Sequence, residues 1–213
     1  MAQDAHFSPF DFTRMDEGDD PLFYLQPRLV VHIDDQAIAA AGELFQEEIP
    51  PNSVVLDLLG SWRSHWPKGH PKSRMVGLGL NAVEMENNPD LDEHLVHDVN
   101  KDPHLPLDDG SFDAVVITVS IQYLTRPIEV FQEVNRILKP GGRFLVVFSN
   151  RCFFTKAVKI WVDSGDGQRL DLVRSYFEHA GNYEEVQGGF LNPETSPPGD
   201  PAYMVMARKA AAS

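Results

Sequence analysis

Two stretches decide the fold, LPLDDGSFDAVVI at residues 105–117 and EVNRILKPGGRFLVV at residues 133–147. Each ends in a short apolar run rich in valine and isoleucine, which is typical of a strand buried on both faces. Between these runs, residues 127–138 place apolar side chains at helical spacing, and the sequence KPGG at 139–142 ends that helix. Strand, helix and strand predict a right-handed βαβ unit in a parallel sheet.

The rest of the chain continues this alternation of strands and helices. We expect strands at residues 53–59, 74–80, 93–98, 112–120, 143–148, 183–190 and 202–208, and helices at 35–48, 127–138 and 166–180, with a short helical piece from Ala82. The last two strands form a hairpin joined by a proline-rich turn. This order predicts an α/β protein with a doubly wound, Rossmann-like, seven-stranded sheet. The sheet is mostly parallel with an antiparallel last strand, and helices cover both of its faces.

The length of 213 residues suits one domain with a substantial core. We expect a polar N-terminal segment at 1–22, a cap at 23–50 and the Rossmann-like domain at 51–213. Within the first segment, the acidic run at 16–21 has too few apolar residues to order without a partner surface.

Composition excludes several classes of partner. The net charge of −14 argues against nucleic acid or an anionic membrane, which both require a basic surface. The single cysteine, Cys152, permits no intramolecular disulfide and is consistent with a reducing cytoplasm. The N-terminus lacks a signal-peptide pattern, and no apolar run approaches the ~20 residues of a membrane span. We therefore expect a cytoplasmic protein, whose oligomeric state the sequence leaves open.

The block over residues 105–148 resembles class I S-adenosylmethionine-dependent methyltransferases of the type 11 group, whose sequence pattern it follows closely. The resemblance extends over roughly residues 53–209. It implies S-adenosylmethionine as cofactor and transfer of a methyl group to a small-molecule acceptor, with oxygen, nitrogen and sulfur nucleophiles all open. Only ~50 residues lie outside the core fold, which leaves little for recognition of a large acceptor.

The resemblance places the cofactor at the carboxyl ends of the strands, where open α/β sheets bind ligands. Asp57 stands at the expected acidic position, but the glycine-rich loop after it is altered. Leu59, Ser61 and Arg63 occupy the three glycine positions, and Gly60 is one place out of register. This loop resembles a variant, D-L-x-S-W-x-S-H-x-P, that occurs whole in a subset of small methyltransferase-like proteins, which favours altered cofactor binding over its loss.

Two further landmarks of the resemblance concern the next two strands. Gly79 replaces the acidic residue expected to hold the ribose, and Asn81 is the nearest side chain able to bind ribose hydroxyls. Asp98, followed by Val99, retains the position that reads adenine. Trp62, Arg63 and His65 are candidates for the methionine end of the cofactor. The full candidate set for the cofactor is Asp57, Leu58, Gly60, Ser61, Trp62, Gly79, Leu80, Asn81, Asp98, Val99 and Val119.

On the substrate side, the segment before the first expected core helix carries Tyr24, Arg28 and His32 at intervals of four residues. This spacing places them on one face if the segment is helical after Pro27. We expect them to hold or deprotonate the acceptor, because histidine titrates near neutral pH and arginine attracts anionic groups. Tyr123, just after the fourth strand, completes the catalytic candidates.

Two alternatives remain open at this point. The altered loop also suits a methyltransferase-like fold that binds without catalysing, with Trp62 or Trp66 filling the cofactor volume. GLGLNA at 77–82, followed by Asp98, matches a dinucleotide-binding pattern, although the preceding strand is short and Pro89 interrupts the following helix. A metal site is not expected, since His65 with His70 and His94 with His97 lack a third ligand at usable spacing.

Overall fold

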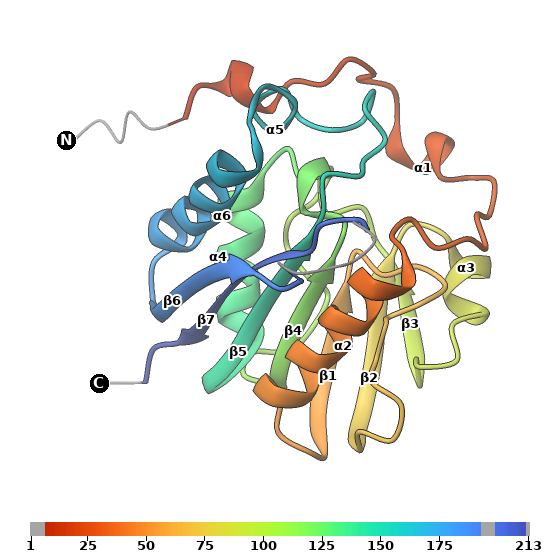
Figure 1. The fold of residues 1–213 in the computed structure, drawn as a ribbon, viewed down its shortest axis with the longest axis vertical. Coiled ribbons are helices and arrows are strands. Elements are labelled where there is room, and N and C mark those ends of the chain that lie inside the picture. Colours follow the sequence, from red (N-terminus) through yellow and green to blue (C-terminus); the bar gives the residue numbers. More distant parts are fainter. Residues whose placement is uncertain (1–6, 193–198, 212–213) are drawn as a thin grey trace.

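A seven-stranded sheet forms the centre of the molecule (Figure 1), in a computed structural model that describes residues 7–192 and 199–211. The strands follow the order β3-β2-β1-β4-β5-β7-β6. Their bounds are β1 Ser53–Leu58, β2 Lys72–Gly79, β3 Glu93–Val96, β4 Phe112–Thr118, β5 Leu138–Phe148, β6 Tyr183–Phe190 and β7 Tyr203–Lys209. The helices are η1 Pro9–Phe12, α1 Asp20–Phe23, α2 Asp35–Glu48, α3 Ala82–Glu86, η2 Ile121–Tyr123, α4 Pro127–Ile137, α5 Lys159–Asp163 and α6 Asp166–Ala180.

Strands β1 to β5 pair in parallel, and β7 runs antiparallel between β5 and β6. The predicted doubly wound sheet with an antiparallel last strand is therefore confirmed. The chain reverses direction across the sheet at β1, which pairs with β2 on one side and β4 on the other. Ligands of open α/β sheets bind at such a switch point.

Helices cover both faces of the sheet because its central strands are apolar on both sides. Helices α4 and α6 pack on one face, where Phe131 and Phe177 meet Phe144 of β5. On the other face, Phe45 of α2 packs over alternate residues of the same strands. Helix α2 occupies the predicted range, and the side chain of Asp34 caps it by accepting a hydrogen bond from the Ala37 amide (2.9 Å).

The boundary between α4 and β5 differs from the prediction. Strand β5 begins at Leu138, which pairs with Phe112, so that the KPGG sequence belongs to the strand. A register shift between Phe112 and Ala114 accommodates it, with Gly141 in a left-handed conformation at φ +75°.

The N-terminal segment crosses the edge of the sheet where the parallel strands end, from the side of α5 and α6 toward α3 (Figure 1). Arg14 forms an isolated antiparallel bridge with Val158. The acidic run at 16–21 thus has a partner surface within the chain itself. Over residues 7–192 and 199–211, no helix is long and apolar enough to cross a membrane, and no three metal-ligating side chains lie together.

Candidate functional site

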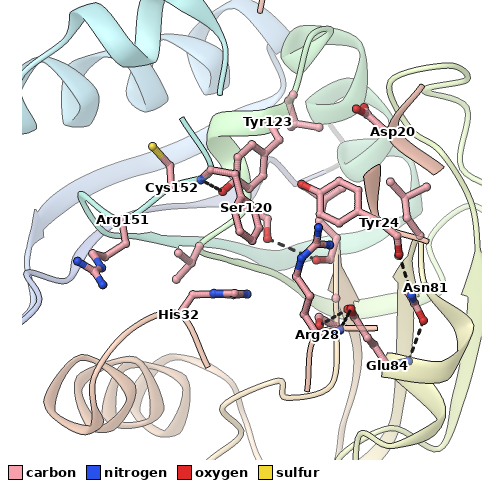
Figure 2. A pocket seen from close by; sticks show the side chains of 18 of the residues that line it. Asp20, Tyr24, Arg28, His32, Asn81, Glu84, Ser120, Tyr123, Arg151 and Cys152 are labelled. Atoms are coloured by element: carbon pink, nitrogen blue, oxygen red, sulfur yellow. Dashed lines mark hydrogen bonds between the residues drawn. The ribbon is translucent and has the colours of Figure 1, made fainter. Parts of the chain in front are cut away.

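A cavity of about 690 Å³ lies at the carboxyl ends of β1, β2 and β4. This volume is within the range of about 300–1,000 Å³ of small-molecule sites. Most of the predicted site residues line it (Figure 2). They are Tyr24, Arg28, His32, Gly60, Ser61, Gly79, Leu80, Asn81, Asp98, Val99, Val119 and Tyr123. Asp57, Leu58 and Trp62 do not line this cavity.

Tyr24, Arg28 and His32 converge without forming a helix, so the predicted helical phase is wrong. Residues 25–34 are irregular, and each of the three side chains instead contacts Phe153. The Phe153 ring lies 5.1 Å from His32 and 6.4 Å from Tyr24, between centroids, and stacks on Tyr123 at 6.0 Å. An aromatic residue from the loop after β5 therefore gathers the polar groups of the cap.

Aromatic rings and the backbone carbonyl of Phe23 hold the Arg28 side chain. Its guanidinium lies 4.8 Å from the Phe23 ring and 5.2 Å from the Phe153 ring. Nη2 donates to the Phe23 carbonyl (2.9 Å), whereas Nη1 is buried without a hydrogen-bond partner among the described residues. An unused buried donor at a cavity wall suits an anionic group of a ligand.

The cavity side chains differ in their capacity to accept a proton. Burial lowers the pKa of His32, so its imidazole is neutral near pH 7 and can accept a proton. Burial raises the pKa of Tyr24 far above its usual range, and raises that of Tyr123 to about 12 although the Phe153 amide donates to its hydroxyl (2.8 Å). Cys152 is half-buried in the same wall, and burial raises its pKa as well. Both tyrosines and the thiol are therefore protonated near neutral pH.

The altered loop adopts a left-handed backbone at a position that is not glycine. Leu59 adopts φ +62°, and Val119 at the end of β4 adopts φ +55°. Left-handed backbone costs a residue with a side chain roughly 1–2 kcal/mol, and strain of this kind gathers at ligand sites. Gly60 extends the pairing of β1, since its amide donates to the Leu78 carbonyl (2.9 Å).

Asp57 lies beneath this loop and does not line the main cavity. It is 2% exposed, and its Oδ2 accepts a hydrogen bond from the buried Ser64 hydroxyl (2.6 Å). Burial raises the pKa of Asp57 to about 7, against the opposing effect of the Ser64 hydrogen bond. The carboxyl lines only a side cavity of about 70 Å³ that shares Gly60, Ser61 and Val119 with the main one. Loop residue Ser64 is the partner that the structure provides.

The two tryptophans leave the cavity open. Trp66 stacks on Phe45 at 6.2 Å, and its indole donates to the His70 carbonyl (3.0 Å). The Trp62 indole donates to the Val30 carbonyl (2.7 Å), which ties the loop to the cap. Arg63 stacks on Trp62 at 3.7 Å and donates to the carbonyls of Trp62 and Asn87, so its contacts point away from the predicted methionine end.

His65 and Leu58 also lie outside the main cavity. His65 lines the side cavity, where burial lowers its pKa to about 4. Leu58 is fully buried in the core on the α4 side of the sheet. Alternation along β1 explains this position, because successive side chains of a strand point to opposite faces.

The end of β2 does not form a phosphate-binding turn. Gly77 lies within the strand beneath Leu91, and Gly79 is the last strand residue. Helix α3 has only five residues, and the side chain of Asn81 caps it by accepting from the Glu84 amide (3.1 Å). The dinucleotide pattern at 77–82 is therefore packing of a strand and a helix cap.

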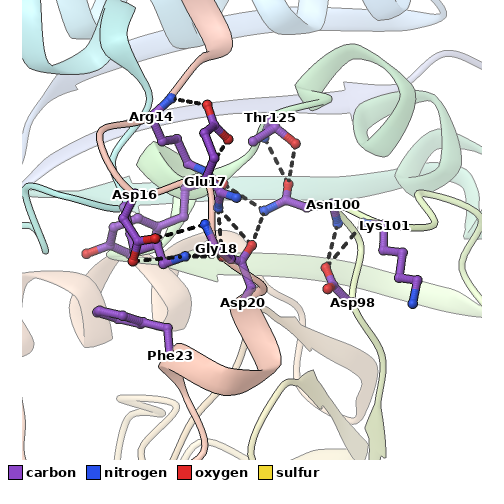
Figure 3. A network of polar contacts seen from close by, with 12 residues as sticks. Arg14, Asp16, Glu17, Gly18, Asp20, Phe23, Asp98, Asn100, Lys101 and Thr125 are labelled. Carbon is purple, nitrogen blue, oxygen red and sulfur yellow. Dashed lines mark hydrogen bonds and ion pairs between the residues drawn. The ribbon is translucent and has the colours of Figure 1, made fainter.

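The loop after β3 is joined to the N-terminal segment through a buried charge network (Figure 3). Asp98 Oδ1 accepts from the amides of Asn100 and Lys101 (3.0 and 3.2 Å). Asn100 Nδ2 donates to Asp20 (2.9 Å), which also binds Arg14 (2.8 Å) and Lys156 (3.1 Å). Asp20 and Lys156 are 5% and 1% exposed, and Asp20 lines the cavity.

Sequence reasoning missed several residues of the cavity wall, namely Asp20, Glu84, Asn100, Ser120, Arg151 and Phe153. Asn81 and Glu84 have the spacing of a helix cap and its third residue, which could have indicated that both lie at one helix start. Asp20 has no such signal, because its partners lie far away in the sequence.

Comparison with known proteins agrees with this geometry. Residues 72–146 match the family model described as a methyltransferase domain. A ubiquinone/menaquinone biosynthesis C-methyltransferase of Ruegeria sp. is 46% identical over 109 residues, which are 46% of this chain and 42% of that protein. The chain spans less than half the length of the curated relatives it matches.

Solved structures share the fold at low identity. An S-adenosylmethionine-dependent methyltransferase from Mesorhizobium loti has a TM-score of 0.58 at 16% identity and covers 79% of this chain and 97% of its own. One from Aquifex aeolicus has a TM-score of 0.56 at 14% identity, with coverage of 90% and 100%. The chain thus matches a methyltransferase domain over residues 72–146 and shares the fold of S-adenosylmethionine-dependent methyltransferases, with an altered glycine-rich loop.

Proposed function

We propose that the protein transfers a methyl group from S-adenosylmethionine to a small-molecule acceptor. The observation that carries this proposal is the open cavity at the switch point, which is lined by the altered loop after β1, the ends of β2 and β4, and the cap. A binding module without catalysis is the second candidate. It predicted a cleft filled by a tryptophan, whereas Trp62 and Trp66 are occupied elsewhere.

The residues present fit this cofactor. Asp98 and Val99 would hold its adenine end, Gly60 and Ser61 would lie along the methionine end, and buried Nη1 of Arg28 would suit a carboxylate of cofactor or acceptor. When bound, S-adenosylmethionine supplies a methyl group activated by a sulfonium. A net charge of −14 favours approach of such a cation.

The chain's own contribution is positioning, exclusion of water and removal of a proton. The cap and the N-terminal segment wall the cavity with Tyr24, Phe153 and Asp20. His32 is the group suited to take a proton from an acceptor that arrives protonated, because its imidazole is neutral near pH 7. Arg28 and Tyr123 would orient the acceptor.

The acceptor class is part of the proposal. Relatives named for ubiquinone and menaquinone biosynthesis support a small acceptor with a ring. Val31 and Phe154 are 44% and 57% exposed while lining the cavity, and Leu29 and Val30 add exposed apolar surface beside them. Such a rim suits an acceptor with an apolar part.

Calorimetric titration with S-adenosylmethionine and S-adenosylhomocysteine tests cofactor binding. Asp98→Ala should weaken both by ~1–3 kcal/mol, while the control Asp102→Ala should not. Absence of heat and of a thermal shift at millimolar ligand would contradict the proposal. Unchanged affinity of a folded Asp98→Ala would remove Asp98 from the site.

Turnover with a panel of phenols, amines and thiols separates the two candidate functions. Loss of turnover in His32→Ala and Arg28→Ala with cofactor affinity retained would place both on the acceptor side. Binding of cofactor without transfer to any member of the panel would favour the binding module.

A further inference from the structure

The end of β2 cannot carry a side chain in this protein. A Cβ atom at Gly79 would lie 2.2 Å from the carbonyl oxygen of Gly60 and 3.3 Å from Sδ of Met85. The backbone contact cannot relax cheaply, because the Gly60 amide is itself bonded to Leu78. The altered loop therefore occupies the space that an acidic side chain at this strand end would need.

Glu84 brings a carboxylate to the same part of the cavity from helix α3. It lines the cavity and is 6% exposed. One oxygen accepts from the Ser61 hydroxyl (2.6 Å) and the other from the Arg28 amide (2.6 Å). Glu84 thus joins the altered loop to the cap at the end of β2 (Figure 2).

This carboxylate has acceptor capacity to spare. A carboxylate offers about four lone-pair sites, and the described residues use one on each oxygen. Within the described ranges, no Lys, Arg or His nitrogen lies within ion-pair distance of it. A buried carboxylate without a cationic partner is costly to retain, and at a cavity wall it indicates a ligand with donors.

Asn81, the residue that the sequence favoured for this task, is fully engaged. Its Oδ1 caps α3 at the Glu84 amide, and its Nδ2 donates to the Tyr24 carbonyl (2.7 Å). It is 9% exposed and fixes the cap to the helix. Asn81 therefore positions Glu84 and leaves the ligand to it.

We infer that Glu84 receives the ribose hydroxyls of the bound nucleoside, which moves this task from the strand end to helix α3. This inference rests on the proposed function. Two adjacent hydroxyl donors match the two free lone pairs, and acidic residues bind ribose hydroxyls in the same way in related α/β folds. Asn81, Ser61 and the Arg28 amide hold the carboxylate in place.

The test measures affinity for S-adenosylhomocysteine and for its 2′-deoxy and 3′-deoxy analogues by calorimetry. Wild-type protein should bind each deoxy analogue about 10- to 100-fold more weakly, the range for one hydrogen bond to a charged group. Glu84→Gln should weaken S-adenosylhomocysteine by a similar factor and respond less to loss of a hydroxyl. Glu86→Gln, an exposed acid on the same helix, should behave as wild type.

The outcomes are distinguishable. Absence of S-adenosylhomocysteine binding by wild type contradicts the proposed function itself. Binding with no penalty for either deoxy analogue overturns the inference without any variant, even if Glu84→Gln fails to fold. The inference is also wrong if loss of a hydroxyl weakens binding to Glu84→Gln by the same factor as binding to wild type. It is wrong too if Glu84→Gln binds S-adenosylmethionine more weakly but S-adenosylhomocysteine as well as wild type does, because that result assigns Glu84 to the sulfonium.

Discussion

Two buried carboxylates beside the cleft, Asp20 and Asp57, have opposite electrostatic environments. Asp57 is 2% exposed and has one hydroxyl partner, and burial raises its pKa to about 7. Asp20 is 5% exposed, and burial would raise its pKa too, but hydrogen bonds from Arg14, Asn100 and Lys156 and the charge of Arg14 lower it instead. The partners rather than the depth of burial decide the charge state.

This difference assigns the two groups different tasks. Asp20 is a fixed anion that joins the N-terminal segment to the loops after β3 and β5. Asp57 titrates within the physiological range beneath the loop that forms the cavity floor. The first holds the site together, and the second makes its stability depend on pH.

Asp20→Ala should have the largest effect, a loss of about 3–5 kcal/mol in the free energy of unfolding. The substitution leaves the Arg14 and Lys156 cations buried without their shared anion. Urea unfolding measures the change, with the exposed neighbour in Asp19→Ala as control. Equal stability of the two variants would show that the network contributes little.

Asp57→Asn should gain stability relative to wild type as pH rises from 4 to 8. A folded pKa near 7, raised from 3.8, means that folding favours the protonated acid, so its contribution falls as pH approaches 7. The gain should reach roughly 4 kcal/mol, at about 1.4 kcal/mol per pKa unit. Unfolding of wild type, Asp57→Asn and the control Glu47→Gln at each pH measures it. A constant difference across the range would contradict the raised pKa.

Lys156→Met should cost less than Asp20→Ala, about 1–3 kcal/mol. Arg14 and Asn100 still bind Asp20 in this variant, and methionine fills much of the volume of the lysine stem. The more exposed Lys159→Met serves as control in the same unfolding assay. A loss as large as that of Asp20→Ala would make Lys156 the main partner.

Ser64→Ala should have the smallest effect, a loss of about 1 kcal/mol in the free energy of unfolding. It should also move the pH at which Asp57 titrates. Its hydroxyl lowers the pKa of Asp57, so its loss should shift the titration of Asp57 above 7. The pH dependence of unfolding reports the shift. Ser164→Ala is the control because, within the described part of the chain, that hydroxyl bonds only to the Ile160 carbonyl. If the pH dependence of unfolding is the same in Ser64→Ala and in wild type, the Ser64 hydroxyl does not contribute to the pKa of Asp57.

The sequence predicted features that have a local pattern and missed those that depend on distant contacts. Strands and helices have local signatures, so α2 at 35–48 and α6 at 166–180 were predicted to the residue. The convergence of Tyr24, Arg28 and His32 was anticipated for the wrong reason, because Phe153 from a distant loop gathers them.

Other parts of the site depend on contacts that leave no local pattern. Asp20 looked like part of an acidic, solvated run, since Lys156 lies far along the chain. The sequence showed only that Gly79 lacks the acidic side chain expected at this position. The position of the Gly60 carbonyl explains why no side chain fits there. Burial and partner identity, which decide the state of Asp57, are also properties of the folded chain alone.

The N-terminal segment has a consequence for synthesis on the ribosome. Lys156 donates to the carbonyl of Gly18 across 138 positions of the chain (2.6 Å). At about 5–20 residues per second, roughly 7–28 s separate the emergence of these two residues. Throughout that interval Arg14 and Asp20 remain hydrated on a nascent chain whose sheet is still incomplete. The segment around Gly18 therefore docks only after Lys156 has been made, and the cleft closes only after β5 has been translated.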